Sequence, residues 1–199
     1  MKKILIIVAI ITSSLFGFSQ DEKPDGYVLI QNYWLQTQGG PSSYDFNVFL
    51  TGKIFGSEKF SFTGFFLAEK PWFEQLLGVT YSPNSWLSVG VSGGVENNPA
   101  LYRLGASLWM GKGKTSWLTL FEKGDGRKNY WYKSALTFET AKHFTVGGLV
   151  QRFVGLGPYF EYHISGKANT NLRLAPWIAP VYDLESGNGR IMAGFDFKF

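Results

Sequence analysis

One repeating pattern dominates the chain from residue 26 to its end. Segments of about ten residues alternate apolar and polar side chains, and short turns rich in Gly, Pro, Asn, Ser or Lys separate them. In the segment 189–199, Ile191, Ala193 and Phe195 alternate with polar or small residues. Because successive side chains of a strand point to opposite faces, each segment predicts a β-strand with one apolar and one mostly polar face.

This pattern predicts an all-β chain of about twelve strands, with about ten as the alternative count, and no segment has a convincing helical period. The predicted ranges are 26–36, 43–53, 58–69, 72–82, 85–95, 100–110, 114–123, 128–140, 143–153, 157–165, 170–178 and 189–199.

Two architectures fit such strands, a soluble β-sandwich and a transmembrane barrel, and they differ in which face meets water. Strand length favours the barrel, because tilted spanning strands need about 9 to 11 residues whereas globular strands average about 5 or 6. An even strand number also brings the chain back to its starting side. We therefore expect a closed antiparallel transmembrane β-barrel with short loops on both sides.

The first twenty residues have the layout of a secretory signal peptide. Lys2 and Lys3 precede an apolar stretch, and small residues follow it before Asp21. The stretch is about 15 residues long, shorter than the roughly 20 that a spanning helix needs. We expect a cleaved signal peptide over 1–20 and a single barrel domain over 21–199. Cleavage removes two lysines from a formal charge of +4, so nucleic-acid binding loses its main support.

The seven tryptophans fall near predicted strand ends rather than strand centres. Tryptophan is enriched where a membrane meets water, so this placement predicts two aromatic girdles. If the amino terminus is periplasmic, the outer girdle holds Trp34, Trp72, Trp131 and Trp177, and the inner girdle holds Trp86, Trp109 and Trp117.

The final segment ends in Gly194-Phe195-Asp196-Phe197-Lys198-Phe199, with aromatic residues at alternating positions. This ending resembles the last strand of bacterial outer-membrane β-barrel proteins, and the signal peptide is similar to those of Bacteroidetes. The resemblance implies an integral outer-membrane protein with both termini in the periplasm and lipid around its wall. It also implies that Phe195, Phe197 and Phe199 form a signal for the barrel-assembly machinery.

By alternation, inward basic and acidic side chains are equal in number. We expect Lys133, Glu161 and Arg173 at mid-depth, with Glu161 and Arg173 nearly opposite each other on adjacent strands. The inward charges are Lys53, Lys59, Arg103, Lys133, Arg173, Arg190 and Lys198 against Asp45, Glu69, Glu74, Glu122, Glu139, Glu161 and Asp196.

Two functions stay open for this lumen. In the first, Lys133, Glu161, Arg173, Arg103, Arg190 and Asp196 form a charged constriction in a narrow porin-like channel for small polar solutes. In the second, the charges satisfy one another in an occluded lumen, and the barrel is an accessory protein that binds partner proteins in an outer-membrane complex. The chain resembles monomeric porins for acidic oligosaccharides in strand number, but its balanced charge departs from their arginine- and lysine-rich lumens.

A hydrolase is a third, remote alternative. His163-Ile164-Ser165 is similar to the His-x-Ser element of outer-membrane phospholipase A and lipid A deacylases. The position twelve beyond Ser165 is Trp177, so the third catalytic residue is not evident. Alternation also points the pair into the lumen, away from lipid. We therefore expect no enzyme and no cofactor, and a chain with two histidines and no cysteine gives little support for a metal site.

Overall fold

A computed structural model describes residues 26–38, 40, 42–69, 72–97, 102–141, 143–165 and 173–198. The predicted signal peptide over 1–20 and Phe199 lie outside these residues. Within the described part of the chain, no helix is long and apolar enough to cross a membrane.

The described residues form thirteen β-strands. They are β1 (Gly26–Thr37), β2 (Ser42–Lys53), β3 (Phe60–Glu69), β4 (Trp72–Asn84), β5 (Leu87–Glu96), β6 (Arg103–Lys112), β7 (Thr115–Gly124), β8 (Tyr130–Ala141), β9 (Phe144–Gln151), β10 (Gly155–Tyr162), β11 (Ile164–Ser165), β12 (Arg173–Asp183) and β13 (Asn188–Lys198).

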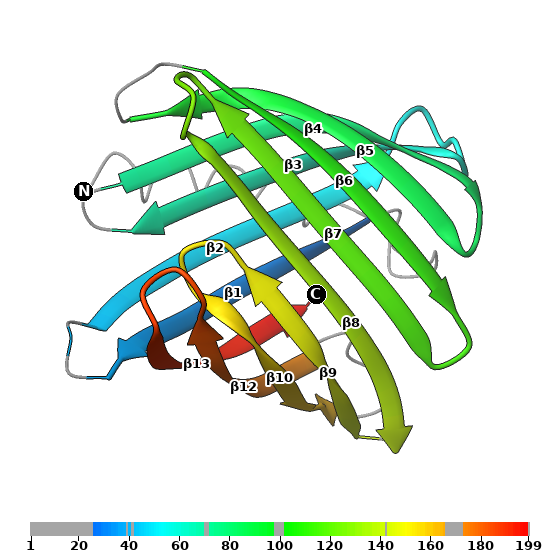
Figure 1. Cartoon of the computed structure of the whole chain (residues 1–199). Helices are drawn as coiled ribbons and strands as arrows, with labels where there is room; N and C mark the ends of the chain where they lie inside the picture. Colours follow the sequence, from blue (N-terminus) through cyan, green and yellow to red (C-terminus); the bar gives the residue numbers. More distant parts are fainter. Residues whose placement is uncertain are drawn as a thin grey trace, which may run out of the picture.

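The strands close into one antiparallel ring (Figure 1). Each strand from β1 to β10 pairs with the next, β12 pairs with β13, and β13 returns to β1. The short β11 continues β10 after His163, because both pair with β12 in one register: Glu161 lies opposite Trp177, and Ile164 lies opposite Leu174. Because β10 and β11 together occupy one place, the ring has twelve strand positions, and the predicted closed twelve-stranded barrel is confirmed.

Alternation along the strands separates an apolar outer wall from the lumen. On β4, Leu77 is 63% exposed and Val79 and Tyr81 are also exposed, while Leu76 is buried on the inner side. Trp34 on β1 and Ile191 on β13 repeat this exposure on neighbouring strands. A wall of exposed apolar side chains with no unpaired strand edge is the arrangement that lipid requires of a β-barrel.

Strand β12 is longer than its sequence predicted. It ends at Asp183 rather than near residue 178, and its last residues pair with β13 from Asn188 to Met192. Ala179 and Val181 are buried there against Met192, and this burial favours the extension. The turn between the two strands is accordingly only 184–187.

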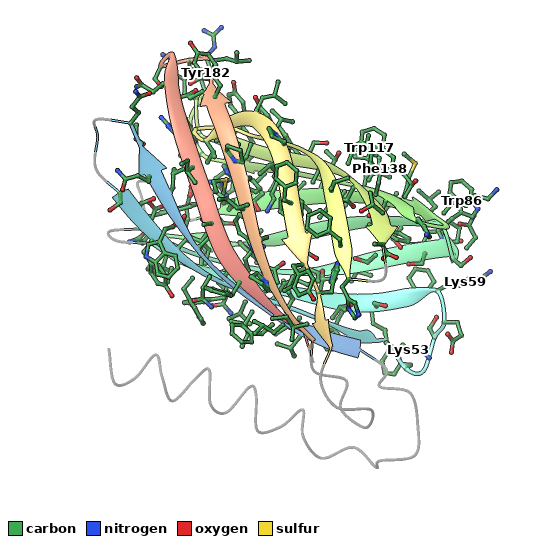
Figure 2. The ribbon with its side chains drawn as sticks, turned by 90° about the horizontal axis from the view of Figure 1, so that it is seen from below. Lys53, Lys59, Trp86, Trp117, Phe138 and Tyr182 are labelled. Carbon is green, nitrogen blue, oxygen red and sulfur yellow. The ribbon has the colours of Figure 1, made fainter. Side chains whose placement is uncertain are left out.

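The barrel has two distinct ends. The start of β1 and the last residues of β13 meet at one end, where Leu29 pairs with Lys198, and we call this the terminal end. We call the opposite end the far end. Lys53, Lys59 and Trp86 lie near the terminal end, and Tyr182 lies at the far end (Figure 2).

Candidate functional site

A cavity of about 1610 Å³ lies inside the barrel. Its lining includes Lys112, Lys114 and Thr115 at the terminal end, and Lys128 and Arg152 at the far end. The cavity is therefore lined by residues of both barrel ends.

The open side of the cavity lies along β3 to β6. Larger side chains such as Leu76 and Trp109 also face inward here, but serine, threonine and glycine recur along this face, and their short side chains leave part of the interior unfilled. They are Ser61, Thr63, Thr80, Ser82, Ser88, Ser92, Gly105 and Ser107.

The opposite side is packed with apolar side chains. They come from β1, β9, β12, β13 and the turn before β10, which are adjacent in the ring. The Tyr33 and Tyr159 rings lie 5.7 and 5.8 Å from that of Trp177. This apolar cluster narrows the lumen toward β3 to β6; it consists of Tyr33, Leu149, Val154, Trp177, Ala179, Val181 and Met192.

Arg103 is the centre of a buried charge cluster near the far end. Its Nε lies 2.8 Å from Glu74 Oε2 and 2.9 Å from Glu122 Oε2, and its Nη1 lies 2.8 Å from Glu96 Oε2. Nη1 also donates to Asn129 Oδ1 at 3.1 Å. One guanidinium therefore faces three carboxyl groups, which come from β4, β5 and β7.

A pair of acidic residues lies beside this charge cluster. Asp45 on β2 is directly opposite Glu69 on β3, and both line the cavity. Asp45 is only 4% exposed, and its Oδ1 has no hydrogen-bond partner. Among the described residues, no base forms an ion pair with either carboxyl group.

Asp196 and Glu161 lie farther from the far end, and each has its own set of hydrogen bonds. Asp196 Oδ1 accepts from Gln31 Nε2 at 2.8 Å and from Trp177 Nε1 at 2.7 Å. Glu161 accepts from the Tyr159 hydroxyl, and its Oε1 lies 3.1 Å from His163 Nε2. These two carboxyl groups are held in fixed positions on the cavity wall.

The six predicted lumen residues do not all converge. Arg103, Lys133, Glu161 and Asp196 line the cavity, and their role as a constriction stays a prediction. Arg190 is not a lining residue: near the start of β13 it donates from Nη2 to Asp183 Oδ2 at 2.8 Å and from Nη1 to the carbonyl oxygen of Phe153.

The expected pairing of Glu161 with Arg173 is wrong. Glu161 lies opposite Trp177, and Arg173 lies opposite Ser165, four positions further along β12. The sequence range began this strand at 170 and ended it near 178, whereas the buried Ala179 and Val181 extend it toward the far end, so its predicted centre was misplaced. The side chain of Arg173 lies outside the described part of the structure.

The two-girdle assignment of the tryptophans is wrong for four of them. Trp34 and Trp117 are exposed on the outer wall. Trp86 is exposed at a turn of the terminal end, where it also borders the cavity (Figure 2). The other four line the cavity, because they share the strand face of inward residues such as Lys133 and Asp196. They are Trp72, Trp109, Trp131 and Trp177.

The His163 imidazole is already engaged in the lumen. Its Nε2 lies 2.8 Å from Thr145 Oγ1 and 3.1 Å from Glu161 Oε1. The Ser165 side chain lies outside the described part of the structure, so the His-x-Ser hypothesis stays a prediction. Of the side chains that the structure describes, no group of three or more His, Asp or Glu residues is placed to hold a metal ion.

Sequence reasoning missed Glu96. It is 3% exposed, lines the cavity and binds Arg103, yet the predicted strand stopped at residue 95. Its position shares the parity of Ser88 and Ser92, so continuing the alternation by one residue finds it.

Phe195 is exposed on the outer wall, and Phe197 has the same parity on β13. Their predicted role as an assembly signal stays a prediction.

Comparison with solved structures finds the same fold in known porins. The KdgM porin superposes with a TM-score of 0.53 at 13% identity, covering 86% of this chain and 99% of that one. A second KdgM structure, in complex with disordered oligogalacturonate, gives 0.51 at 12% identity with the same coverage. The NanC porin gives 0.54 at 7% identity, covering 86% of this chain and all of the other.

The sequence by itself gives no such relationship. No protein-family model matches it, and the search of curated proteins found no match. At these identities the structural likeness concerns the architecture alone: the chain has the fold of the KdgM and NanC porins.

Proposed function

We propose that this protein is an integral outer-membrane barrel that forms a narrow channel for small polar solutes. The observation that carries the proposal is the cavity lined by residues of both barrel ends. Spread over the roughly 30 Å of a hydrocarbon core, its volume corresponds to a mean cross-section of about 50 Å². That area admits water and small ions and is far smaller than the lumen of a 16-stranded porin.

The setting of this channel follows from the same fold. The exposed apolar wall faces lipid, and both termini lie in the periplasm, as an even strand number allows. The barrel-assembly machinery reads the terminal aromatic residues during biogenesis. KdgM was solved with oligogalacturonate, an acidic sugar, but the described lining here has seven acidic and six basic residues, and this balance does not favour that class of solute.

A second candidate function is an occluded accessory barrel that binds partner proteins. The apolar cluster of β1, β9, β12 and β13 favours it, since these side chains fill part of the lumen. The two candidates differ in whether the folded protein conducts ions.

Planar-bilayer recording of the folded protein separates the two. We expect discrete conductance steps from the wild-type barrel. Thr80→Trp places a large ring on the open side of the cavity and should lower the conductance several-fold, about in proportion to the area it removes from the passage. Its control is Val79→Trp, one residue away on the lipid-facing side of β4, which should leave the conductance unchanged. Folded protein without conductance steps would refute the channel and favour the accessory barrel.

A further inference from the structure

The charged residues of the cavity wall are nearly balanced in number, with seven acidic and six basic residues among those described, but the two signs are not evenly distributed. The basic lining residues are Arg103, Lys112 and Lys133 in strands and Lys114, Lys128 and Arg152 in turns. The acidic lining residues are Asp45, Glu69, Glu96, Glu122, Glu139, Glu161 and Asp196.

Most of these carboxyl groups are gathered in one arc near the far end. Asp45 pairs with Glu69 across β2 and β3, and Glu74 pairs with Glu96 across β4 and β5. Glu122 on β7 completes the arc, with Arg103 between it and Glu96. The arc follows consecutive strands around the side of the lumen that the apolar cluster leaves open.

The arc is not neutralised by its own base. Arg103 supplies one positive charge to the three glutamates that it contacts. Asp45 and Glu69 face each other without an ion pair to any base among the described residues. Even when the pair shares one proton, one negative charge remains at the cavity wall.

We propose that the lumen is selective for small cations over anions, and that Asp45 and Glu69 carry most of this preference. This inference rests on the proposed channel function. A narrow passage with walls of one charge sign concentrates ions of the opposite sign, and rings of Asp and Glu select cations in this way. Because the apolar cluster occupies the opposite side, a solute passing the far end lies close to the arc.

The test is the reversal potential of single channels in a tenfold KCl gradient at low ionic strength. The wild-type protein should show the sign of a K⁺-preferring pore. The double variant Asp45→Asn/Glu69→Gln preserves side-chain size and should lower the K⁺/Cl⁻ permeability ratio by roughly three- to tenfold, the range expected for a charge about 5 Å from the ion path. Raising the salt should shrink the difference between the two proteins.

Glu58→Gln is the matched control. It removes the same charge from an exposed side chain in a turn of the terminal end, which is 81% accessible and forms an ion pair with Lys53. The permeability ratio should stay at the wild-type value. Retention of the folded, heat-modifiable electrophoretic form shows that each variant has closed its barrel.

The possible outcomes distinguish this inference from the channel proposal. Conductance with Cl⁻ preference, or with none, overturns cation selectivity and leaves the channel intact. Cation preference that survives the double variant overturns the assignment to Asp45 and Glu69. Absence of conductance overturns the channel itself, and the inference with it. Should the double variant fail to fold, Thr63→Lys adds a positive charge on the cavity face of β3 and must also lower the ratio.

Discussion

Arg103 is the residue on which the far end of the lumen depends most. It is 2% exposed, contacts three buried glutamates, and stacks over the Trp72 ring with 5.3 Å between Cζ and the ring centroid. A buried ion pair contributes little net stability relative to an apolar core, but removing one partner leaves the other charge buried without compensation. Loss of the Arg103 guanidinium would leave three buried glutamates without a compensating charge.

We expect Arg103→Gln to lower the free energy of unfolding by about 3 to 5 kcal/mol, the range typical of an uncompensated buried charge. The comparison is Lys53→Gln, whose exposed pair with Glu58 should contribute at most about 1 kcal/mol. Urea titration of both variants in lipid vesicles, followed by tryptophan fluorescence, measures the difference. Equal effects of the two substitutions would contradict the central role of Arg103.

For a single residue, its odd or even place in the strand alternation predicts its surroundings better than its distance from the strand end does. Lys133 and Trp131 share one face of β8, and both line the cavity. The girdle prediction used only the distance of each tryptophan from a strand end, and it therefore assigned Trp131 to the lipid interface. The alternation that placed Lys133 inward already contained the correct answer.

At the scale of a single element, β9 contains two neighbouring glycines with different surroundings. A Cβ added at Gly147 would lie 2.2 Å from the carbonyl oxygen of Leu136 on β8, so only glycine permits this close approach of the strands. A Cβ at Gly148 would have no heavy atom within 4 Å. The two positions therefore form a natural pair for testing how tightly β8 and β9 pack.

Gly147→Ala should destabilise the barrel by about 1 to 3 kcal/mol, since the strands must separate to admit a methyl group. Gly148→Ala should be neutral or stabilising by up to about 1 kcal/mol, because alanine reduces the entropy of the unfolded chain. The fraction of heat-modifiable protein after refolding into detergent, at several temperatures, reports both effects. A Gly147→Ala protein that refolds as well as Gly148→Ala would contradict the close packing.

Elements could be predicted from the sequence, but their mutual register could not. Alternation and turn residues placed twelve strands, since each signal lies within a few neighbouring residues. The partner of Glu161 depends on where β12 begins and how far it extends, and the burial of Ala179 and Val181 against Met192 extends it to Asp183. That burial exists only after the ring has closed, so no local pattern announces it.

At the scale of the whole molecule, the barrel has an apolar exterior and a lumen divided into a packed and an open side. Small residues along β3 to β6 face the apolar cluster across the interior. The polar face of each strand could be predicted one strand at a time. The division of the lumen into a packed and an open side could not be predicted, because it depends on which strands lie across the barrel from each other.

The tryptophans offer a direct test of this inside-and-outside arrangement. Trp34 and Trp117 are exposed on the outer wall, whereas Trp177 is 5% exposed within the lumen. In vesicles of brominated lipid, bromine quenches only tryptophans that it approaches closely. Trp34→Phe and Trp117→Phe should each reduce the quenchable fraction of fluorescence by roughly one seventh or more, and Trp177→Phe should not reduce it. A loss of quenching in Trp177→Phe equal to that in Trp34→Phe would place the lumen residue against lipid and contradict the fold.

The pairing of β1 with β13 has a consequence for engineering. Leu29 lies opposite Lys198, so the first and last described strands are direct neighbours in the ring. A short linker joining them, with a new opening at the Gly113 turn between β6 and β7, would yield a circular permutant with the same twelve pairings. The closed ring has no first strand, so the order of the strands in the sequence can be changed while their order around the barrel stays the same.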